Sequence, residues 1–437
     1  MPSRKILLLL EQELRQLLAS RPFWFLLFFI GPLVGQGFIA AVEAYAEASG
    51  IGGGPAALAQ GLSPLDGIFV PAFGAYDLAA MLLFPFVAIR FISSEKESGS
   101  WKLLLQAPVN LSTVLISKCL VLLAGWLVLW IPGIAVIVFW ASYGGSIHWP
   151  ELLNLLAGHF LRVLLSTAVA LGAAAIAKNA ASAAILTLAF TVGGWALEFV
   201  AAGRGGWLEL MASHTPTSAL RLFEQGLCQA STVAVCLALS GSGFLLAWVW
   251  LLPLRRPWMV TAVWIVALAT LLIVGSQIRP AWDLSENRRN SFPSEDVETL
   301  GRIDSPLRMI VHLAPEDPSR TDLDRNIVAK LRRSVQHFRV EYAAHSQAGM
   351  FESAGSHYGE IWYEAGARKQ MSRSTTEPIV LSVIYEVTQV SAPARRDETV
   401  YTGHPLAAHA NGAATFYYLA WPCLAGLAFL LVSKGRE

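Results

Sequence analysis

Two groups of charged side chains are the candidates for function in a chain that is otherwise strongly apolar. The first is the string Glu95-Lys96-Glu97-Ser98-Gly99, which places acids and a glycine directly after an apolar run. A short amphipathic turn around Leu104 follows, and Pro108 ends it. Such an element beneath a membrane suits docking onto a soluble partner. The alternative is an ordinary interfacial loop.

The second group consists of ionisable residues inside long apolar runs, namely Asp77, His159, Arg162 and Glu198. His159 and Arg162 are three positions apart, so a helix places them on one face. Ionisable groups are costly within a bilayer, which makes these four residues candidates for an intramembrane polar pathway. Alternatively, they lie at the depth of the outer leaflet and reach lipid headgroups or water.

The sequence shows no motif for chemistry of its own. A phosphate-binding loop of the form G-x-x-x-x-G-K-[ST] is missing, and Gly241-Ser242-Gly243, which lacks the lysine, is typical of helix packing. The nine histidines do not have metal-ligand spacing. The four cysteines fit neither a disulfide framework nor a zinc site. We therefore expect no enzymatic activity, no metal and no cofactor in this chain.

The composition indicates a membrane protein. Of 437 residues, 54% are hydrophobic and only 14% are charged, whereas soluble domains carry about 25% charged residues. The mean hydropathy is +0.50. These values exclude a disordered chain, a coiled coil and an ordinary cytosolic enzyme. The net charge of +1 gives no indication of a nucleic-acid partner.

Eight apolar runs are long enough to cross a bilayer, because a spanning helix needs about 20 residues. They cover residues 23–42, 68–92, 112–140, 153–177, 180–202, 231–252, 258–278 and 414–432. Pro32, Pro85 and Pro132-Gly133 lie inside these runs, where neighbouring helices can satisfy the carbonyls that proline frees. The sequence therefore predicts an all-α polytopic membrane protein.

Positive charge is distributed unevenly over the short loops. It gathers before the first run and after the second, fourth, sixth and eighth runs, at Arg4, Lys5, Arg15, Arg21, Arg90, Lys96, Lys102, Lys118, Lys178, Arg255, Arg256, Lys434 and Arg436. Loops 43–67 and 144–151 carry no Lys or Arg. Because Lys and Arg in short loops stay in the cytoplasm, we expect both termini there and a multi-pass location in the bacterial cytoplasmic (inner) membrane.

Residues 4–20 predict an amphipathic helix lying in the membrane interface. Leu7, Leu10, Leu14, Leu17 and Leu18 share one helical face, and charged or amide side chains share another. The alternative is a signal peptide, which the polar string EQELRQ and the lack of a small-residue cleavage site disfavour.

The polar segment 281–412 predicts a small extracytoplasmic α/β domain inserted between the last two membrane helices. Strands are expected at 307–313, 338–344 and 398–401, helices at 322–337 and 375–390, and a hairpin at 359–372 that turns at Ala365-Gly366. This segment is long enough to fold by itself.

Residues 85–109, PFVAIRFISSEKESGSWKLLLQAPV, resemble the coupling region of ABC-2 type permeases, which has the pattern E-K/R-x-x-G-T/S-x-x-x-L-L-x-x-P. The likeness is closest to the gliding-motility (Gld-type) branch. It implies that an ATPase meets Glu95, Lys96, Glu97, Ser98, Gly99, Leu104 and Pro108. Lys178-Asn179 with Ala183-Ala184 resembles the family's cytoplasmic N-x-x-x-A turn, and Lys118 occupies the place of its lysine at the third span. Phe223-x-x-Gly226-Leu227 resembles its outer F-x-x-G motif.

The remainder of the chain resembles the Gld-type auxiliary protein. Residues 283–292, DLSENRRNSF, are similar to its D-L-T-x-x-K/R-x-x-S-L motif, and Thr376-Glu377 to the start of its T-E helix. Residues 400–404, VYTGH, resemble its T-G-H motif, but Pro405-Leu406 replaces the final Gly-Glu. The last span follows almost at once, so the resemblance implies a truncated auxiliary domain.

The expected organisation is an interfacial helix (1–22), a six-span ABC-2 permease domain (23–254), a seventh membrane helix (255–280), the α/β domain (281–412), and an eighth helix with a short tail (413–437). The resemblance implies an exporting permease subunit of an ABC transporter. A separate ATPase subunit would bind ATP and Mg and dock on 93–109. A second copy or a similar permease would complete the transporter in the lipid bilayer. The alternative is an ATP-driven mechanical or assembly module that acts on an envelope protein through the outer domain without solute transport.

Overall fold

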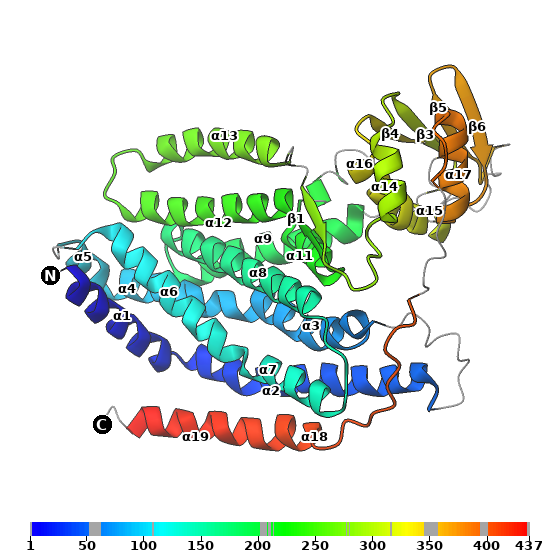
Figure 1. The fold of residues 1–437 in the computed structure, drawn as a ribbon. Coiled ribbons are helices and arrows are strands. Elements are labelled where there is room, and N and C mark those ends of the chain that lie inside the picture. The colour runs from blue at the N-terminus through cyan, green and yellow to red at the C-terminus, as the bar shows by residue number, and fades with distance from the viewer. Residues whose placement is uncertain are drawn as a thin grey trace, which may run out of the picture.

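Long helices lying side by side make up most of the molecule (Figure 1). The computed structural model describes residues 2–51, 63–106, 109–201, 208, 211–212, 214–276, 278, 280–314, 317–344, 357–393 and 401–434. Within that part of the chain, eight helical segments are long and apolar enough to cross a membrane. The eight predicted spans are therefore confirmed by length and composition.

The spans are single helices or short series of helices. Five of these spans are single helices: α2 (Arg21–Ala46), α8 (Trp149–Ile176), α9 (Ala180–Ala201), α12 (Ala230–Leu251) and α13 (Pro257–Ser276). The second span consists of η3 (Leu65–Phe69), α3 (Val70–Leu78), η4 (Ala79–Leu83) and α4 (Phe84–Ser98), and the third of α6 (Leu111–Leu129) and α7 (Ile131–Ser142). The last span consists of α18 (Ala413–Thr415), η6 (Phe416–Ala420) and α19 (Trp421–Lys434). Shorter helices are α1 (Pro2–Ala19), η1 (Glu47–Ile51), α5 (Ser100–Gln106) and α11 (Pro216–Glu224).

The third span breaks at Trp130, where Pro132 begins a new helix. Two tyrosine hydroxyl groups from other spans satisfy the freed backbone. Tyr76 donates to the Leu129 carbonyl at 3.0 Å and accepts the Gly133 N–H at 2.8 Å. Tyr417 donates to the Pro132 carbonyl at 2.9 Å. The neighbouring helices thus compensate for this proline as the sequence predicts.

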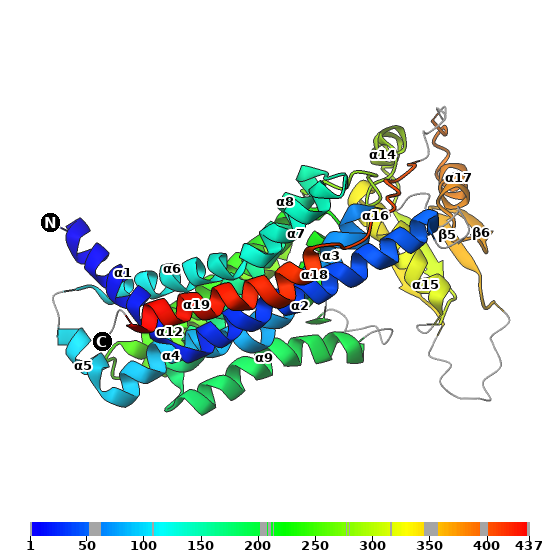
Figure 2. The same cartoon turned by 90° about the horizontal axis from the view of Figure 1, so that it is seen from below.

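The last helix returns to the first one. Helix α19 lies beside α2 in both orientations (Figures 1 and 2), and the two helices pack together. Helix α13 packs on α12 and leaves almost its whole surface exposed. We call the end of the bundle with α1, α5 and both termini the α5 end, and the opposite end the sheet end (Figure 1).

Helix α1 bends away from α2 at Ser20 and packs on α6. Only part of the predicted apolar face of α1 is buried in this packing. Leu17 is buried, whereas Leu7 and Leu14 are exposed. The exposed leucines remain available to lipid, as an interfacial helix requires.

A four-stranded sheet with the order β4-β3-β5-β6 stands at the sheet end. Its strands are β3 (Leu307–Val311), β4 (Phe338–Tyr342), β5 (Ile361–Ala365) and β6 (Arg368–Ser372). Strands β3 and β4 are parallel and are joined through α15 (Pro318–Leu323), η5 (Asp324–Val328) and α16 (Ala329–Ser334), whereas the other pairs are antiparallel. Helices α14 (Ser294–Gly301) and α17 (Glu377–Thr388) complete this α/β unit.

The interior of the α/β unit follows the alternation of its strands. Met309 and Tyr363 point to the helix-covered side and are buried together with Ile327 and Ile384. The strands and helices predicted for 307–390 agree with the structure to within a few residues. The expected strand at 398–401 lies outside the described residues, except for Tyr401, which is not in a strand.

Candidate coupling site

Gly99 turns the chain from α4 into α5. Its φ of +78° is in the left-handed region that favours glycine, and its N–H bonds the Lys96 carbonyl at 3.3 Å. The hydroxyl groups of Ser98 and Ser100 lie 2.8 Å apart and both donate to the Glu95 carbonyl. A side chain at position 99 would strain this turn, so the glycine fixes the direction of α5.

Lys96 closes the end of helix α8. Its Nζ donates to three carbonyl oxygens, at 3.0 Å (Ala174), 2.9 Å (Ala175) and 2.6 Å (Ala177). The last carbonyls of a helix have no partner within the helix and carry partial negative charge. One lysine of α4 therefore satisfies the end of a separate membrane helix.

Glu97 and Asn179 hold the beginning of helix α9. The Glu97 Oε1 accepts the Ala180 N–H at 3.2 Å, and the Asn179 Oδ1 accepts the Ser182 N–H at 2.8 Å. Acceptors at a helix N-terminus satisfy free N–H groups and suit the positive end of the helix dipole. Lys178 lies in this junction and is exposed.

Lys118 is the centre of a buried charge cluster. Its Nζ lies 2.8 and 2.9 Å from the two carboxylate oxygens of Glu13 and 2.8 Å from Glu95 Oε1. Gln16 donates to the same Glu95 oxygen at 3.1 Å. Burial raises the pKa of Glu13, and the Lys118 ammonium opposes that rise. One ammonium thus holds two carboxylates from α1 and α4.

Helix α5 presents apolar side chains at the α5 end. Trp101 is buried beneath it and Leu104 packs on the bundle core, whereas Leu103 is 69% exposed and Leu105 is 39% exposed. Pro108 lies outside the described residues. Exposed leucines on a short helix are typical of a protein contact surface.

A pocket of about 340 Å³ opens beside α5. It lies between the α1–α2 junction and the end of α4, and is lined by Gln16, Ala19, Ser20, Arg90, Phe91, Ser94, Glu95, Ser98 and Ser100. The pocket and the exposed leucines of α5 both lie at the α5 end, and together they are the candidate surface for a soluble partner.

The structure thus brings most of the predicted coupling residues to one place and adds two. Glu13 and Gln16 were not predicted. Glu13 lies three residues after Leu10 and four before Leu17, so it interrupts the apolar face of α1. An acid on a buried helix face needs a cation beside it, so the position of Glu13 in the sequence could have indicated a buried ion pair.

The profile described as ABC-2 family transporter protein matches residues 7–251, more than half of the chain. The chain belongs to this family. No curated protein and no solved structure matches it. Members of the family are membrane transport subunits that pair with an ABC ATPase subunit and are not themselves ATPases. The matched residues of this permease include α1 from Leu7 onward and the whole candidate coupling site. Helix α13, the α/β unit and α19 lie beyond them.

Inside the permease, Arg162 pairs with Asp77. The Arg162 Nε lies 2.8 Å from Asp77 Oδ1, and its Nη2 lies 3.4 Å from the Thr217 hydroxyl. Arg162 is 3% exposed, and its Nη1 has no hydrogen-bond partner among the residues that the structure describes. Burial raises the pKa of nearby Glu224 to about 7, and the Asp77 charge adds to this rise. Glu224 is a further acid that sequence reasoning missed.

His159 and Glu198 do not join this pair. The His159 ring is buried among the rings of Phe73 and Trp130, and neither of its nitrogens bonds a described residue. Glu198 accepts the Thr215 hydroxyl and lies 3.3 Å from Arg221. The alternative that such residues reach headgroups or water does not fit His159 and Arg162, because the surrounding helices bury both side chains.

A second set of contacts, which we call the outer clamp, joins the permease to residues 281–290. Strand β1 (Leu227–Gln229) pairs antiparallel with β2 (Ala281–Asp283). Gly226, at a φ of +79°, accepts the Leu284 N–H at 2.9 Å, and a Cβ at Gly226 would lie 3.0 Å from Ser285. The two motifs 223–227 and 283–292, which lie far apart in the sequence, are therefore neighbours.

Side chains strengthen the outer clamp. The carboxylate of Asp283 accepts the N–H groups of Ser285 and Asn290, and the Asn290 amide donates to the Gln225 carbonyl at 2.8 Å. Glu286 binds His404 at 2.7 Å and Tyr401 at 3.0 Å. These bonds lower the pKa of Glu286, although its partial burial opposes the shift. The Tyr45 hydroxyl of α2 donates to the His404 carbonyl at 2.7 Å, so both ends of the α/β segment are held on the permease.

Proposed function

We propose that this permease is an exporter driven by a separate ATPase subunit that docks on residues 93–109. The observation that supports the proposal is the position of Lys96 and Glu97. They connect the docking surface to the end of α8 and the beginning of α9. A push on α5 therefore acts directly on three spans. ATP and Mg would be bound by the partner, and closure of its nucleotide sites would favour one arrangement of these helices.

The proposal includes the cellular arrangement. The α5 end faces the cytoplasm of a bacterium, both termini lie there, and the α/β unit lies outside the inner membrane. A second copy of the chain, or a similar permease, completes the transporter. The segments with Gld-type resemblance make the chain a fusion of a Gld-type permease with a truncated auxiliary domain. The asymmetric distribution of Lys and Arg and the geometry of the coupling site support this arrangement.

Replacing both Leu103 and Leu105 with aspartate is expected to weaken the ATPase contact strongly. Two charges would enter the centre of an apolar interface, and a lost hot spot of about 2 kcal/mol weakens binding roughly thirtyfold. The measurement is copurification and stimulation of ATP hydrolysis, with the ABC ATPases of the same genome coexpressed one at a time.

Met371→Asp is the matched control, because Met371 is a 40% exposed apolar residue on the α/β unit at the opposite end. It should leave both readouts unchanged. Full copurification and stimulation with the doubly substituted α5 would contradict the proposed docking surface.

The outer clamp favours a second function, in which the ATP cycle moves the α/β unit against an envelope protein. Strand pairing and the Glu286 contacts hold the unit at both of its ends. Motion of the outer ends of the spans would therefore reach residues 281–290 and, through the bond of Arg333 to the Asn290 carbonyl, the α/β unit. In this alternative, no solute crosses the membrane.

Asp283→Ala is expected to loosen the clamp, because the N–H groups of Ser285 and Asn290 lose their acceptor. At about 1 kcal/mol for each lost hydrogen bond, hydrogen exchange at 284–290 should accelerate about tenfold or more. Asp304→Ala, at an exposed aspartate of the same unit, is the control. Export that continues in the loosened protein would argue against the mechanical function. Absence of export in both the unmodified and the loosened protein, with ATPase stimulation intact, would support the mechanical function.

A further inference from the structure

A groove on the lipid-facing side separates parts of α2 and α19. Nearer the sheet end, the two helices touch. Trp421 covers Gly31 and donates its indole N–H to the Leu27 carbonyl at 2.9 Å, and Tyr417 covers Gly35. A Cβ on either glycine would overlap these rings. Toward the α5 end, the small residues Ala425 and Gly426 of α19 leave a groove beside α2. Beyond these small residues, Trp24 and Phe429 meet edge to face with ring centroids 5.5 Å apart, so this aromatic pair forms one wall of the groove.

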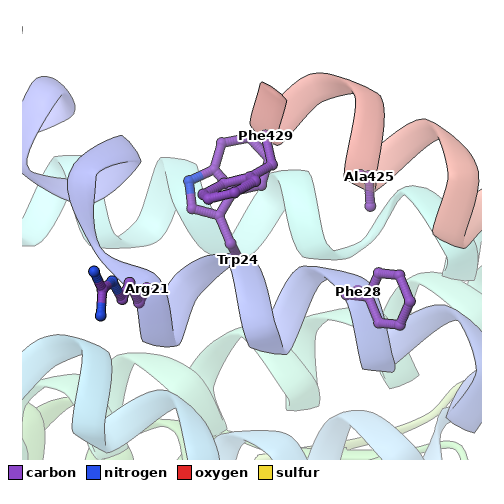
Figure 3. Close-up of a pocket in the computed structure, with 6 residues that line it drawn as sticks. Arg21, Trp24, Phe28, Ala425 and Phe429 are labelled. Carbon is purple, nitrogen blue, oxygen red and sulfur yellow. The ribbon is translucent and has the colours of Figure 1, made fainter. Parts of the chain in front are cut away.

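The groove has a volume of about 190 Å³ (Figure 3). It is lined by Arg21, Trp24, Phe28, Ala425, Gly426 and Phe429. A Cβ built on Gly426 would meet nothing within 4 Å, so this glycine leaves the space open. The Trp24 indole N–H is already bonded to the Leu18 carbonyl at 2.7 Å. The groove therefore has apolar walls with their polar atoms satisfied.

Arg21 is the cation among the described residues that line this groove. Arg21 is the first residue of α2, is exposed, and forms no ion pair with any described residue. Arginine at the end of a membrane helix lies at headgroup depth, where its planar donors match a phosphate. Both walls belong to membrane spans, so the apolar part of the groove faces acyl chains rather than water.

We propose that this groove is a binding site for one anionic phospholipid, with the phosphate on Arg21 and an acyl chain between Trp24, Phe28 and Gly426. The charge of Arg21 selects an anionic headgroup over a zwitterionic one. The bound chain fills the space beneath α19 and holds this helix against α2. Because α19 lies beyond the residues matched by the family profile, this site does not depend on the proposed coupling to an ATPase.

The test is native mass spectrometry of the full chain in detergent, with phosphatidylglycerol and phosphatidylcholine as probes. We expect the unmodified protein to prefer phosphatidylglycerol about fivefold, since one cation near the membrane surface contributes about 1 kcal/mol. Arg21→Gln should abolish this preference. Gly426→Leu should lower the binding of both lipids, because its side chain fills the groove. Thermal unfolding of each variant shows whether the protein remains folded.

Arg255→Gln and Gly193→Leu are the matched controls. Arg255 is an exposed arginine in the α12–α13 loop, and Gly193 is a glycine of α9 with open space around it. Both variants should bind lipid as the unmodified protein does. Equal binding of the two lipids by the unmodified protein, a preference that survives Arg21→Gln, or binding unchanged by Gly426→Leu would each overturn the proposal. A change of oligomeric state in Gly426→Leu without lipid loss would assign the groove to a second copy instead.

Discussion

Lys118→Met is expected to destabilise the permease by about 3–5 kcal/mol, because it leaves two buried carboxylates without their counter-charge. Lys118 is fully buried, and Glu13 and Glu95 are at most 5% exposed. The ammonium also joins α6 to α1 and α4. The lost contact should therefore release α1 and change the position of α5. Thermal unfolding in detergent and ATPase stimulation are the measurements.

Lys102→Met removes an exposed lysine close to the same site and is the matched control. Its stability should stay close to that of the unmodified protein. Adding Glu13→Gln and Glu95→Gln to Lys118→Met should recover much of the loss, since the uncompensated charges are then gone. Equal stability of Lys118→Met and Lys102→Met would show that the cluster contributes nothing.

The pH dependence of the Lys118→Met variant provides an independent readout. Burial raises the pKa of Glu13 above its ordinary value of 4.5, and loss of the lysine removes the opposing effect. Between 4.5 and the raised pKa, the folded chain binds more protons than the unfolded chain, so stability falls as the pH rises. The variant should therefore be most stable in mild acid, and its deficit should grow toward neutral pH.

Local patterns were sufficient for most of the fold. The lengths of the apolar runs predicted the spans. A short apolar run predicted β3, alternation predicted β4, and the turn at Ala365-Gly366 predicted the hairpin. These features depend on residues that are close in the chain. The pairing of β1 with β2 joins residues more than 50 positions apart, and the two motifs involved carry no complementary pattern. Only the folded structure shows that they form one clamp.

The candidate coupling site was likewise predictable from the sequence only in part. The string from Glu95 to Gly99 predicted the site, because its residue types and spacing resemble a known region. It did not predict that Lys96 and Glu97 bind the ends of two other helices. It also did not connect Lys118 with Glu13, since 105 positions separate them. A buried ion pair depends on which helices pack together. The apolar pattern of a helix face does not specify which other helix it will pack against.

Asp77→Asn is expected to cost about 3–5 kcal/mol of stability, because it leaves the Arg162 guanidinium buried without its anion. The Arg162 side chain is 1% exposed and the Asp77 side chain is 23% exposed, so the guanidinium has little access to water that could replace the carboxylate. One of its nitrogens already has no partner among the described residues, which adds to the cost. Asp66→Asn is the control, because the Asp66–Arg289 pair is 49% and 26% exposed. Exposed pairs contribute about 0–1 kcal/mol. The unfolding temperature of Asp77→Asn should therefore be clearly lower than that of Asp66→Asn.

The double variant Asp77→Asn with Arg162→Met separates stability from transport. Removing both charges should restore most of the stability lost in Asp77→Asn, because no uncompensated ion remains. If the pair belongs to an intramembrane polar pathway, the restored protein should fold and couple to its ATPase but fail to transport. A restored protein that transports normally would limit Asp77 and Arg162 to a structural role, in which they join the second span to the fourth.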